Sequence, residues 1–333
     1  MKVILNQQAC DVDADMVQLS ALLDSQGVPQ TGVAVALNGE VVPRATWPKV
    51  VLADGDRVDL VKIVAGGADD DSGGERLVIA GRTFQSRLFM GSGRFISPSV
   101  MRAALEASGT EMVTVAIRAT GVDGSGPDAG ILASLDRGRY HLLPNTAGAT
   151  TVRQAVFMAQ LAREALGTNW VKLEVIGDER TLWPDVAGTV EATRILVEED
   201  FVVLPYTTCD LVTAIRLEEA GAATVMPLGS MIGSGQGVKD WEGIRRIVER
   251  VSVPVVVDAG IGTPSDAVLA MEAGASACLI NTAISRSDDP PTMAAAMRHA
   301  VIAGYLAYLA GRMPVSDYAI PSSPPTGLVG VGR

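Results

Sequence analysis

The sequence predicts an α/β protein in two parts, a small β-rich unit followed by a (β/α)8 barrel. Three observations support this prediction. Residues 1–67 combine short strand-like runs, one helical pattern and two hairpin turns. Residues 68–76 are acidic and glycine-rich. From residue 88 onward, eight short apolar runs alternate with helical patterns, which indicates βαβ units and a parallel sheet. Eight such units fit a closed barrel better than an open doubly wound sheet.

The first unit has the pattern of a ubiquitin-like β-grasp fold. A helix is predicted over 17–26 from the spacing of its apolar residues, and Gly27 ends it. Asn38-Gly39 and Asp54-Gly55 are hairpin turns between strand-like runs. The predicted strands are 3–5, 33–37, 41–42 and 58–64. A strand, a helix and further strands in so short a segment are typical of this fold.

Residues 68–76 are predicted to link the first unit to a barrel domain over 77–333. Three consecutive Asp residues and a glycine pair give this segment the composition of a flexible spacer. The first unit itself ends in a glycine pair, Gly66-Gly67. Both pairs can be explained as spacer alone, and that interpretation stays open at this point.

The barrel strands are predicted at the apolar runs, because a parallel strand that is covered on both faces should be apolar throughout. These strands are 88–91, 112–117, 141–144, 170–176, 201–205, 224–228, 254–259 and 277–281. Helical patterns between them include 152–166, 189–199, 211–220, 241–251 and 266–273.

Composition excludes several classes of protein. Apolar residues make up 48% and charged residues 20%, as is usual for a globular protein. The net charge of −11 argues against nucleic acid as a partner, because phosphate backbones require a basic face. The first residues are too polar for a signal peptide, and no run approaches the roughly 20 apolar residues that span a bilayer. We therefore expect a cytoplasmic protein without a membrane partner.

Cysteines and histidines do not predict a metal site. Cys10, Cys209 and Cys278 lie far apart, and an odd number of cysteines suits a reducing compartment. His141 and His299 are too few to build a histidine site, and His141 should lie on the stability face of the barrel. No sequence neighbour of Cys209 would lower its pKa, so we expect it to be inert.

The segment WVKLEVIGD, residues 170–178, places two charges in a predicted buried strand. Its apolar residues would face the outer helices, whereas Lys172 and Glu174 share the other parity and point into the barrel. Burying both charges costs several kcal/mol unless they pair, so an internal ion pair is one explanation. We favour a nucleophilic lysine beside an acid/base carboxylate, because Lys is rarely buried and commonly forms Schiff bases.

The pKa of Lys172 decides whether this interpretation is workable. At an ordinary pKa of about 10.4, the amine is almost fully protonated at neutral pH and cannot attack a carbonyl. Desolvation would lower that pKa, whereas the Glu174 carboxylate would raise it. Lys172 can act as a nucleophile only if desolvation is the stronger effect or if substrate binding disrupts the pair.

Glycine-rich turns follow the last predicted strands. Asp258 ends one strand, and Ala259-Gly260 leads from it into a helix, whose N-terminus offers N–H groups to an anion. Asn281-Thr282 ends the next strand. These are predicted strands seven and eight, whose loops often bind phosphate in such barrels. A third glycine-rich loop, 227–237, could close over the same phosphate.

The barrel part carries several characteristic strings: LPNTAG (143–148), WVKLEVIGD (170–178), FVVLPYTT (201–208), VMPLGSMIGSG (225–235), VVVDAGIGTPSDA (255–267), LINTAI (279–284) and LAYLAGRMP (306–314). Together they resemble the ThiG family of thiazole synthases in thiamin biosynthesis. The first unit resembles the sulfur carrier ThiS through LNGEVVPR (37–44), LADGDRVDLV (52–61) and the closing Gly66-Gly67. The chain is therefore similar to a fusion of a carrier with a synthase.

The resemblance implies a barrel that condenses 1-deoxy-D-xylulose 5-phosphate, dehydroglycine and carrier thiocarboxylate sulfur into thiazole phosphate carboxylate, without a cofactor. It implies that Lys172 forms an imine with the sugar ketone, and that Glu174 and Asp258 act as acid and base. The residues implied to hold the sugar phosphate are Gly233, Ala259, Gly260, Asn281 and Thr282. The implied partners are a carrier adenylyltransferase, a dehydroglycine-producing enzyme and further copies of the chain in a homo-oligomer.

The implied carrier terminus, Gly66-Gly67, raises a chemical difficulty. A sulfur carrier is activated at a free C-terminal carboxylate, but the carboxyl group of Gly67 forms a peptide bond with Ala68. We hypothesise that the chain is cut between Gly67 and Ala68, which frees a tail that docks at the barrel mouth. The competing hypothesis is that the first unit is an uncut interaction module and a separate carrier delivers sulfur.

The chain also departs from the family pattern in its early loops. Ala119 follows Arg118 where a second Arg is usual, and Ala149 stands where a Cys is common. The segment 120–138 is unusually glycine-rich. Two other functions therefore stay open: another Schiff-base barrel enzyme acting on a sugar phosphate, such as an aldolase, and a catalytically silent fusion that serves as a scaffold.

Overall fold

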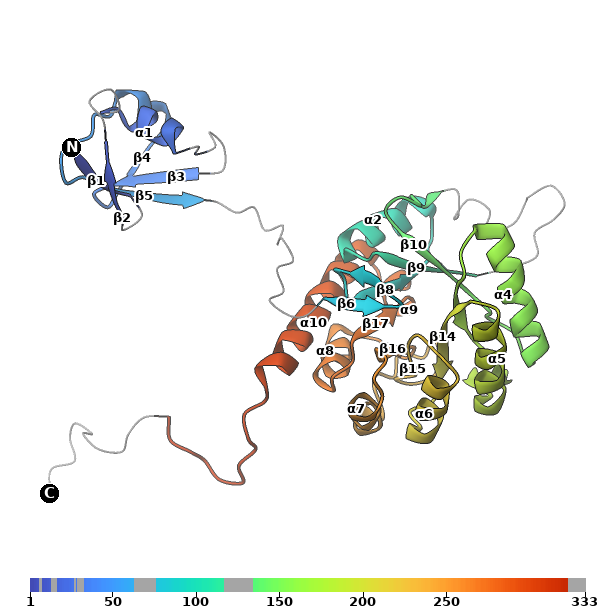
Figure 1. Ribbon diagram of the computed structural model, residues 1–333. Coiled ribbons are helices and arrows are strands. Elements are labelled where there is room, and N and C mark those ends of the chain that lie inside the picture. The colour runs from blue at the N-terminus through green and yellow to red at the C-terminus, as the bar shows by residue number, and fades with distance from the viewer. Residues whose placement is uncertain are drawn as a thin grey trace, which may run out of the picture. The chain divides into compact units, whose positions relative to one another are not determined.

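The computed structural model describes residues 1–5, 8–12, 17–26, 28, 33–62, 76–116 and 134–322. The chain divides into two compact units, Met1–Asp71 and Ser72–Arg333 (Figure 1). Most of the predicted linker lies outside the described residues. The domain bounds of 1–67, 68–76 and 77–333 therefore stay predictions.

In its described residues, the first unit is a five-stranded sheet with one α-helix and one 3-10 helix. Its elements are β1 (Lys2–Leu5), β2 (Gln8–Asp11), α1 (Leu19–Ser25), β3 (Val33–Leu37), β4 (Glu40–Val42), η2 (Arg44–Lys49) and β5 (Arg57–Lys62). The strand order is β2-β1-β5-β3-β4, with β1 parallel to β5 and the other pairs antiparallel. This is the β-grasp arrangement that the sequence predicts.

The apolar face of α1 holds this small sheet together. Leu19, Leu22 and Leu23 recur at helical spacing and are buried in one cluster with Val3 of β1 and Val58 of β5. Strand β2 was not predicted, because its four residues show no apolar alternation. It forms by pairing along β1 at the edge of the sheet.

The second unit is a closed barrel of eight parallel strands. In chain order they are β8 (Leu88–Gly91), β9 (Met112–Ala116), β10 (His141–Asn145), β11 (Trp170–Leu173), β14 (Val202–Thr207), β15 (Met226–Pro227), β16 (Val256–Asp258) and β17 (Ala277–Ile280). The first and last pair with each other, and hydrogen bonds join β15 to β16: Val256 N–H donates to Val225 O at 2.9 Å, and Gly229 N–H donates to Asp258 O at 2.9 Å. The predicted barrel is thus confirmed.

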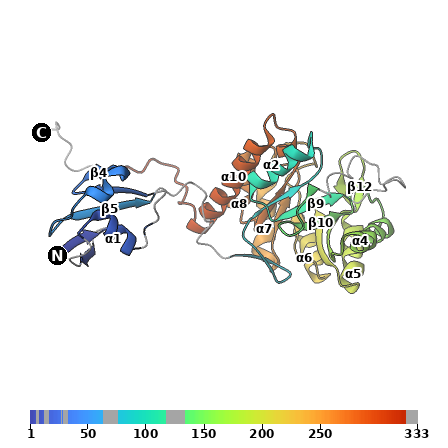
Figure 2. The same cartoon turned by 90° about the horizontal axis from the view of Figure 1, so that it is seen from above.

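Helices cover the outside of the barrel (Figure 1, Figure 2). They are α2 (Pro98–Ser108), α4 (Val152–Leu166), α5 (Val186–Glu198), α6 (Leu211–Glu219), α7 (Trp241–Arg250), α8 (Pro264–Glu272) and α10 (Pro290–Ala310), with a short α9 (Thr282–Ser285) after β17. Among the described helices, only α10 is long and apolar enough to cross a membrane, with a mean hydropathy of 1.2. It packs against α2 and α8, and 33% of its apolar window is buried.

A hairpin that the sequence analysis did not predict lies against the N-terminal end of the barrel. Its strands, β6 (Leu77–Ile79) and β7 (Arg82–Phe84), pair antiparallel. Leu77, Ile79 and Phe84 are buried in one cluster with residues from all eight barrel strands. The hairpin therefore closes this end, and a substrate must enter at the other.

His141 lies at this closed end, as the sequence predicts. Its ring contacts Trp170 edge-on, with centroids 4.5 Å apart, and also faces Phe84. Burial, assisted by the charge of Arg82, lowers the pKa of His141 to about 4. The side chain is thus neutral at physiological pH and belongs to the apolar closure of the barrel.

The barrel interior is layered with a period of two residues along each strand. The layer beside the hairpin is apolar and includes Met112, Leu143, Trp170 and Val256. The residues two positions further along the same strands are polar, namely Thr114, Asn145, Lys172 and Asp258. They line a cavity at the carboxyl ends of the strands, which is where such barrels place their active sites.

Candidate active site

The cavity at the carboxyl end of the barrel has a volume of about 290 Å³. It is lined by every barrel residue that the sequence analysis predicted for the site: Lys172, Glu174, Asp258, Gly233, Ala259, Gly260, Asn281 and Thr282. The structure thus brings residues of β11, β16 and the loops after β15, β16 and β17 into one place.

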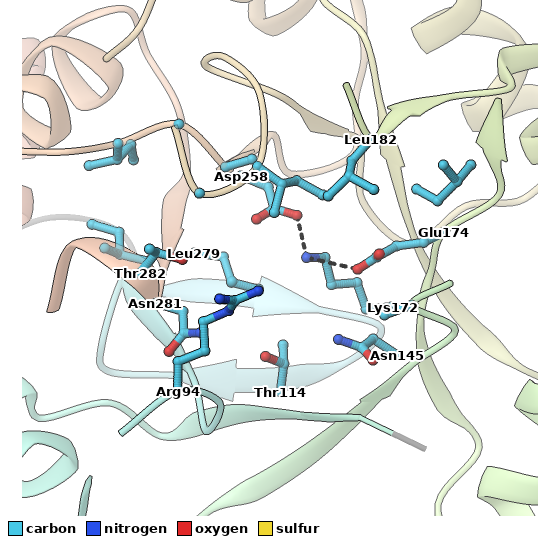
Figure 3. A pocket seen from close by; sticks show the side chains of 18 of the residues that line it. Arg94, Thr114, Asn145, Lys172, Glu174, Leu182, Asp258, Leu279, Asn281 and Thr282 are labelled. Carbon is cyan, nitrogen blue, oxygen red and sulfur yellow. Dashed lines mark ion pairs between the residues drawn. The ribbon is translucent and has the colours of Figure 1, made fainter. Parts of the chain in front are cut away.

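Lys172 lies between two carboxylates (Figure 3). Its Nζ is 2.5 Å from Oδ2 of Asp258 and 3.3 Å from Oε1 of Glu174. The three side chains are only 7%, 4% and 6% exposed, in that order. Leu173 and Val175 point the other way and are buried with residues of α4 and α5. The alternation in the sequence therefore places both charges inside the barrel.

The electrostatics of this cluster favour a protonated lysine in the unliganded protein. Burial lowers the pKa of Lys172, but the charges of Asp258 and Glu174 together raise it more, so it lies above its ordinary value. Burial raises the pKa of Glu174, which Lys172 opposes and Asp258 reinforces. Desolvation is thus not the stronger effect at Lys172. A neutral amine requires that substrate binding disrupt the ion pairs.

The surrounding residues hold the cluster in place. Thr146 Oγ1 donates to Glu174 O and accepts from Glu174 N–H, both at 2.8 Å, which fixes the chain just after β11. The buried ring of Tyr206 lies 5.8 Å from Lys172 Nζ, and its hydroxyl donates to Leu182 O at 3.3 Å. These contacts restrict the reach of the amine.

Glycine turns form another side of the cavity. Among the described residues, the backbone N–H groups of Gly233 and Gly260 have no hydrogen-bond acceptor, so both are available to an anion. The N-terminus of α8 contributes less than the sequence suggests. The N–H groups of Gly262 and Thr263 donate to the Asp266 carboxylate at 3.0 and 2.9 Å, so the helix caps itself.

Gly260 is required by close packing as well as by its backbone. It has φ +76° and follows Ala259 at +63°, so two successive residues adopt the left-handed conformation. A Cβ at Gly260 would overlap Ser230, whose loop packs directly against this turn. Any side chain at position 260 would therefore push the two loops apart.

Two polar lining residues, Thr114 and Asn145, were not predicted. Both belong to the layer that also contains Lys172, and Asn145 pairs with Lys172 across β10 and β11. Oδ1 of Asn145 is buried and has no hydrogen-bond partner among the described residues. A usable signal was present: Thr114 is a polar residue within an apolar run and Asn145 directly follows one, and both have the inward parity.

Arg94 is a third lining residue that the sequence analysis missed. It lies in the loop between β8 and α2 and has φ +69°, a conformation that costs a non-glycine residue about 1–2 kcal/mol. Side chains do not alternate in direction along a loop as they do along a strand. The sequence therefore gives no signal that the side chain of Arg94 points into the cavity.

Several other expectations concern residues near or outside the cavity. Gly66-Gly67 and Arg118-Ala119 lie outside the described residues. Ala149 is buried beside α4 and does not line the cavity. Burial and the charge of Asp240 raise the pKa of Cys209 to about 12, in line with the inert thiol that was expected.

Comparison with known proteins decides the family. The model of the family Thiazole biosynthesis protein ThiG matches residues 78–324, and the ThiS family model matches residues 3–67. The chain belongs to the ThiG family of thiazole synthases. Its first unit belongs to the ThiS family, so this ThiG-family enzyme is a fusion of the two.

Relatives agree with this assignment. The ThiG-family enzyme is 44% identical over 330 residues to a thiazole synthase of Paramagnetospirillum magneticum, covering 99% of this chain and 100% of the relative. It is 55% identical over 258 residues to a thiazole synthase of Methylobacterium sp., covering 78% and 96%. It also resembles a crystal structure of the BexX/CysO complex of Amycolatopsis orientalis, with 37% identity, a TM-score of 0.68, and coverage of 74% of this chain and 100% of that one.

Proposed function

We propose that this enzyme builds the thiazole of thiamin from 1-deoxy-D-xylulose 5-phosphate, dehydroglycine and carrier thiocarboxylate sulfur, through an imine at Lys172. Its membership of the ThiG family supports a thiazole-forming reaction in thiamin biosynthesis. The single observation that carries the imine is the buried amine of Lys172, held by Asp258 and Glu174 in the cavity.

The first chemical step is loss of a proton from Lys172. Its Nζ already contacts Asp258 Oδ2, so the proton has a direct acceptor when the sugar ketone enters and alters the ion pairs. The neutral amine then attacks the ketone carbon. The resulting hydroxyl leaves as water after it takes a proton from Glu174, whose raised pKa suits a general acid.

The same carboxylates can serve the later proton shifts. An imine acidifies the neighbouring C–H group of the sugar, and a carboxylate of Asp258 or Glu174 can remove that proton to give an enamine. Tautomerisation then moves the carbonyl to the neighbouring carbon, where carrier sulfur can add. The carrier acyl group then passes to the oxygen of that carbon and leaves with it as the carrier carboxylate. The dehydroglycine nitrogen displaces the Lys172 amine from the neighbouring carbon, its own carbon takes the sulfur, and loss of a sugar hydroxyl as water completes the ring. Both carboxylates lie within 3.3 Å of Lys172 Nζ, which supports these roles.

We assign the sugar phosphate to the glycine turns. The free N–H groups of Gly233 and Gly260 supply donors, and the left-handed Ala259-Gly260 turn is the kind of backbone that binds phosphate. Asn281 and Thr282 line the same side of the cavity. The acidic net charge of the protein does not oppose this binding, because the donors are backbone groups.

Two experiments test the proposed function against the open alternatives. Borohydride should trap an imine between deoxyxylulose phosphate and the full chain, which a catalytically silent scaffold would not form. Thiazole phosphate carboxylate should then appear only when a thiocarboxylate carrier is supplied. Turnover of the sugar phosphate without sulfur would instead indicate an aldolase-type enzyme.

We further propose that the ThiS-family unit acts as the carrier after cleavage between Gly67 and Ala68. The support is chemical, since an amide at Gly67 leaves no carboxylate for an adenylyltransferase to activate. The intact mass of the protein from its own host tests this. A single full-length species that makes thiazole with a detached carrier would favour the uncut interaction module.

The remaining partners follow from the proposed reaction. Dehydroglycine requires an enzyme that produces it, and the carrier requires an adenylyltransferase. We also propose a cytoplasmic, homo-oligomeric enzyme, as the resemblance to the ThiG family implies.

A further inference from the structure

Arg94 brings into the cavity a positive charge that the catalytic account does not use. Its side chain extends from the loop after β8 into the cavity, toward the Lys172–Asp258 pair (Figure 3). No ion pair or hydrogen bond holds the guanidinium among the residues that the structure describes. The group is therefore available to bind a ligand in the cavity.

The backbone at Arg94 is further evidence of a role. With φ +69°, the position is one where glycine would be unstrained, and Gly91 and Gly93 stand beside it. A long charged residue held in an unfavourable conformation, without a hydrogen bond or ion pair among the described residues, indicates that its side chain serves a function.

The charges in the cavity indicate what Arg94 binds. Apart from Arg94, the lining side chains among the described residues carry one cation, Lys172, and two carboxylates, Glu174 and Asp258. An anionic group close to this cluster would be repelled unless a further cation were present. The glycine turns already supply donors to the phosphate, whereas no residue is yet assigned to the carboxylate of dehydroglycine.

The reaction places that carboxylate near Lys172. The nitrogen of dehydroglycine must bond to the sugar carbon that Lys172 holds, so its carboxylate ends a few bonds from Nζ, on the part of the cavity toward which Arg94 extends. We propose that Arg94 binds this carboxylate through its planar guanidinium, and so selects a carboxylated two-carbon imine as the partner of the sugar. This inference rests on the proposed function.

The test compares Arg94→Gln, Arg94→Lys and Arg94→Gly in the full chain with a thiocarboxylate carrier. Glyoxylate in excess ammonium serves as the probe, because the two form the carboxylated imine with loss of water. We expect Arg94→Gln to raise the half-saturating glyoxylate concentration by about tenfold or more, as loss of a charge-assisted contact should. Arg94→Lys keeps the charge and should show a smaller rise.

Two matched readouts separate recognition from general damage. Imine trapping with deoxyxylulose phosphate should stay within about twofold of the parent in Arg94→Gln, because that step precedes carboxylate binding. Arg94→Gly should melt no lower than the parent, since glycine relieves the strained backbone, yet should lose glyoxylate affinity as Arg94→Gln does.

Three results would overturn the proposal. The first is an unchanged half-saturating glyoxylate concentration in Arg94→Gln. The second is weaker trapping with deoxyxylulose phosphate but not with deoxyxylulose, which would make Arg94 a phosphate ligand. The third is a markedly lower melting temperature in Arg94→Gly, which would give the side chain a structural role. A parent protein that traps no imine would refute the proposed function itself, so the two failures are distinguishable.

Discussion

Oδ2 of Asp258 lies 2.5 Å from Nζ of Lys172, although β14 and β15 separate their strands in the sheet. Only closure of the barrel brings the two side chains together. The cluster of Lys172, Asp258 and Glu174 is thus a property of the folded barrel, and each of its charges affects the pKa of the amine.

Asp258→Asn should lower the pKa of Lys172. Burial lowers this pKa and the Asp258 charge is the largest effect that raises it, so removing the charge lets burial act with less opposition. We expect acetylation of Lys172 by acetic anhydride, followed by mass spectrometry, to reach half its maximal rate at a lower pH. Asp178→Asn, at an exposed residue that forms no ion pair with the amine, is the matched control. An unchanged or higher midpoint in Asp258→Asn would contradict the electrostatic account.

Glu174→Gln should change the pH dependence of stability. The folded pKa of Glu174 is raised, so its contribution is greatest below its unfolded pKa and is lost as pH rises through the folded value. Relative to the parent, Glu174→Gln should therefore gain unfolding free energy between about pH 5 and about pH 8. Urea unfolding at the two pH values measures this. Glu249→Gln, at an exposed residue, should show no such gain with pH. The same gain in Glu249→Gln would mean that the effect at Glu174 does not come from its burial.

Lys172→Ala should abolish imine trapping and also destabilise the barrel. It leaves two buried carboxylates without their cation, which should cost about 3–5 kcal/mol at neutral pH. The cost should shrink in acid, where the carboxylates become neutral. The double variant Lys172→Ala/Asp258→Asn buries one charge fewer and should be more stable than the single variant. Equal stability of parent and Lys172→Ala would mean that the cluster is better solvated than the structure indicates.

Gly260→Ala should impair phosphate binding. Its Cβ would overlap Ser230 and displace the turn that offers N–H donors, so we expect the half-saturating deoxyxylulose phosphate concentration in imine trapping to rise by about tenfold or more. Gly233→Ala is the matched comparison, because its Cβ would meet nothing nearer than 3.9 Å, and it should have a smaller effect. If Gly260→Ala raises the half-saturating concentration of deoxyxylulose, which lacks the phosphate, by the same factor, the turn does not bind phosphate.

Periodicity made the fold and part of the site predictable from the sequence. The eight apolar runs correspond to the eight barrel strands, because a strand covered on both faces must be apolar. Parity placed Lys172 and Glu174 inside, since side chains alternate along a strand. The same rule applied to β9 and β10 would have added Thr114 and Asn145.

What the sequence analysis missed depends on tertiary contacts. The β6–β7 hairpin consists of two three-residue strands, too short for a periodic signal, and is held by the end of the barrel that it covers. Arg94 owes its position to a loop conformation, and the self-capping of α8 by Asp266 appears only once the turn is built.

The most direct test of the central claim is to locate the trapped imine by tandem mass spectrometry. The full chain is treated with deoxyxylulose phosphate and borohydride, digested and sequenced. We expect the reduced sugar adduct to be attached to Lys172. An adduct on another lysine, or none at all under conditions in which the enzyme forms thiazole, would contradict it.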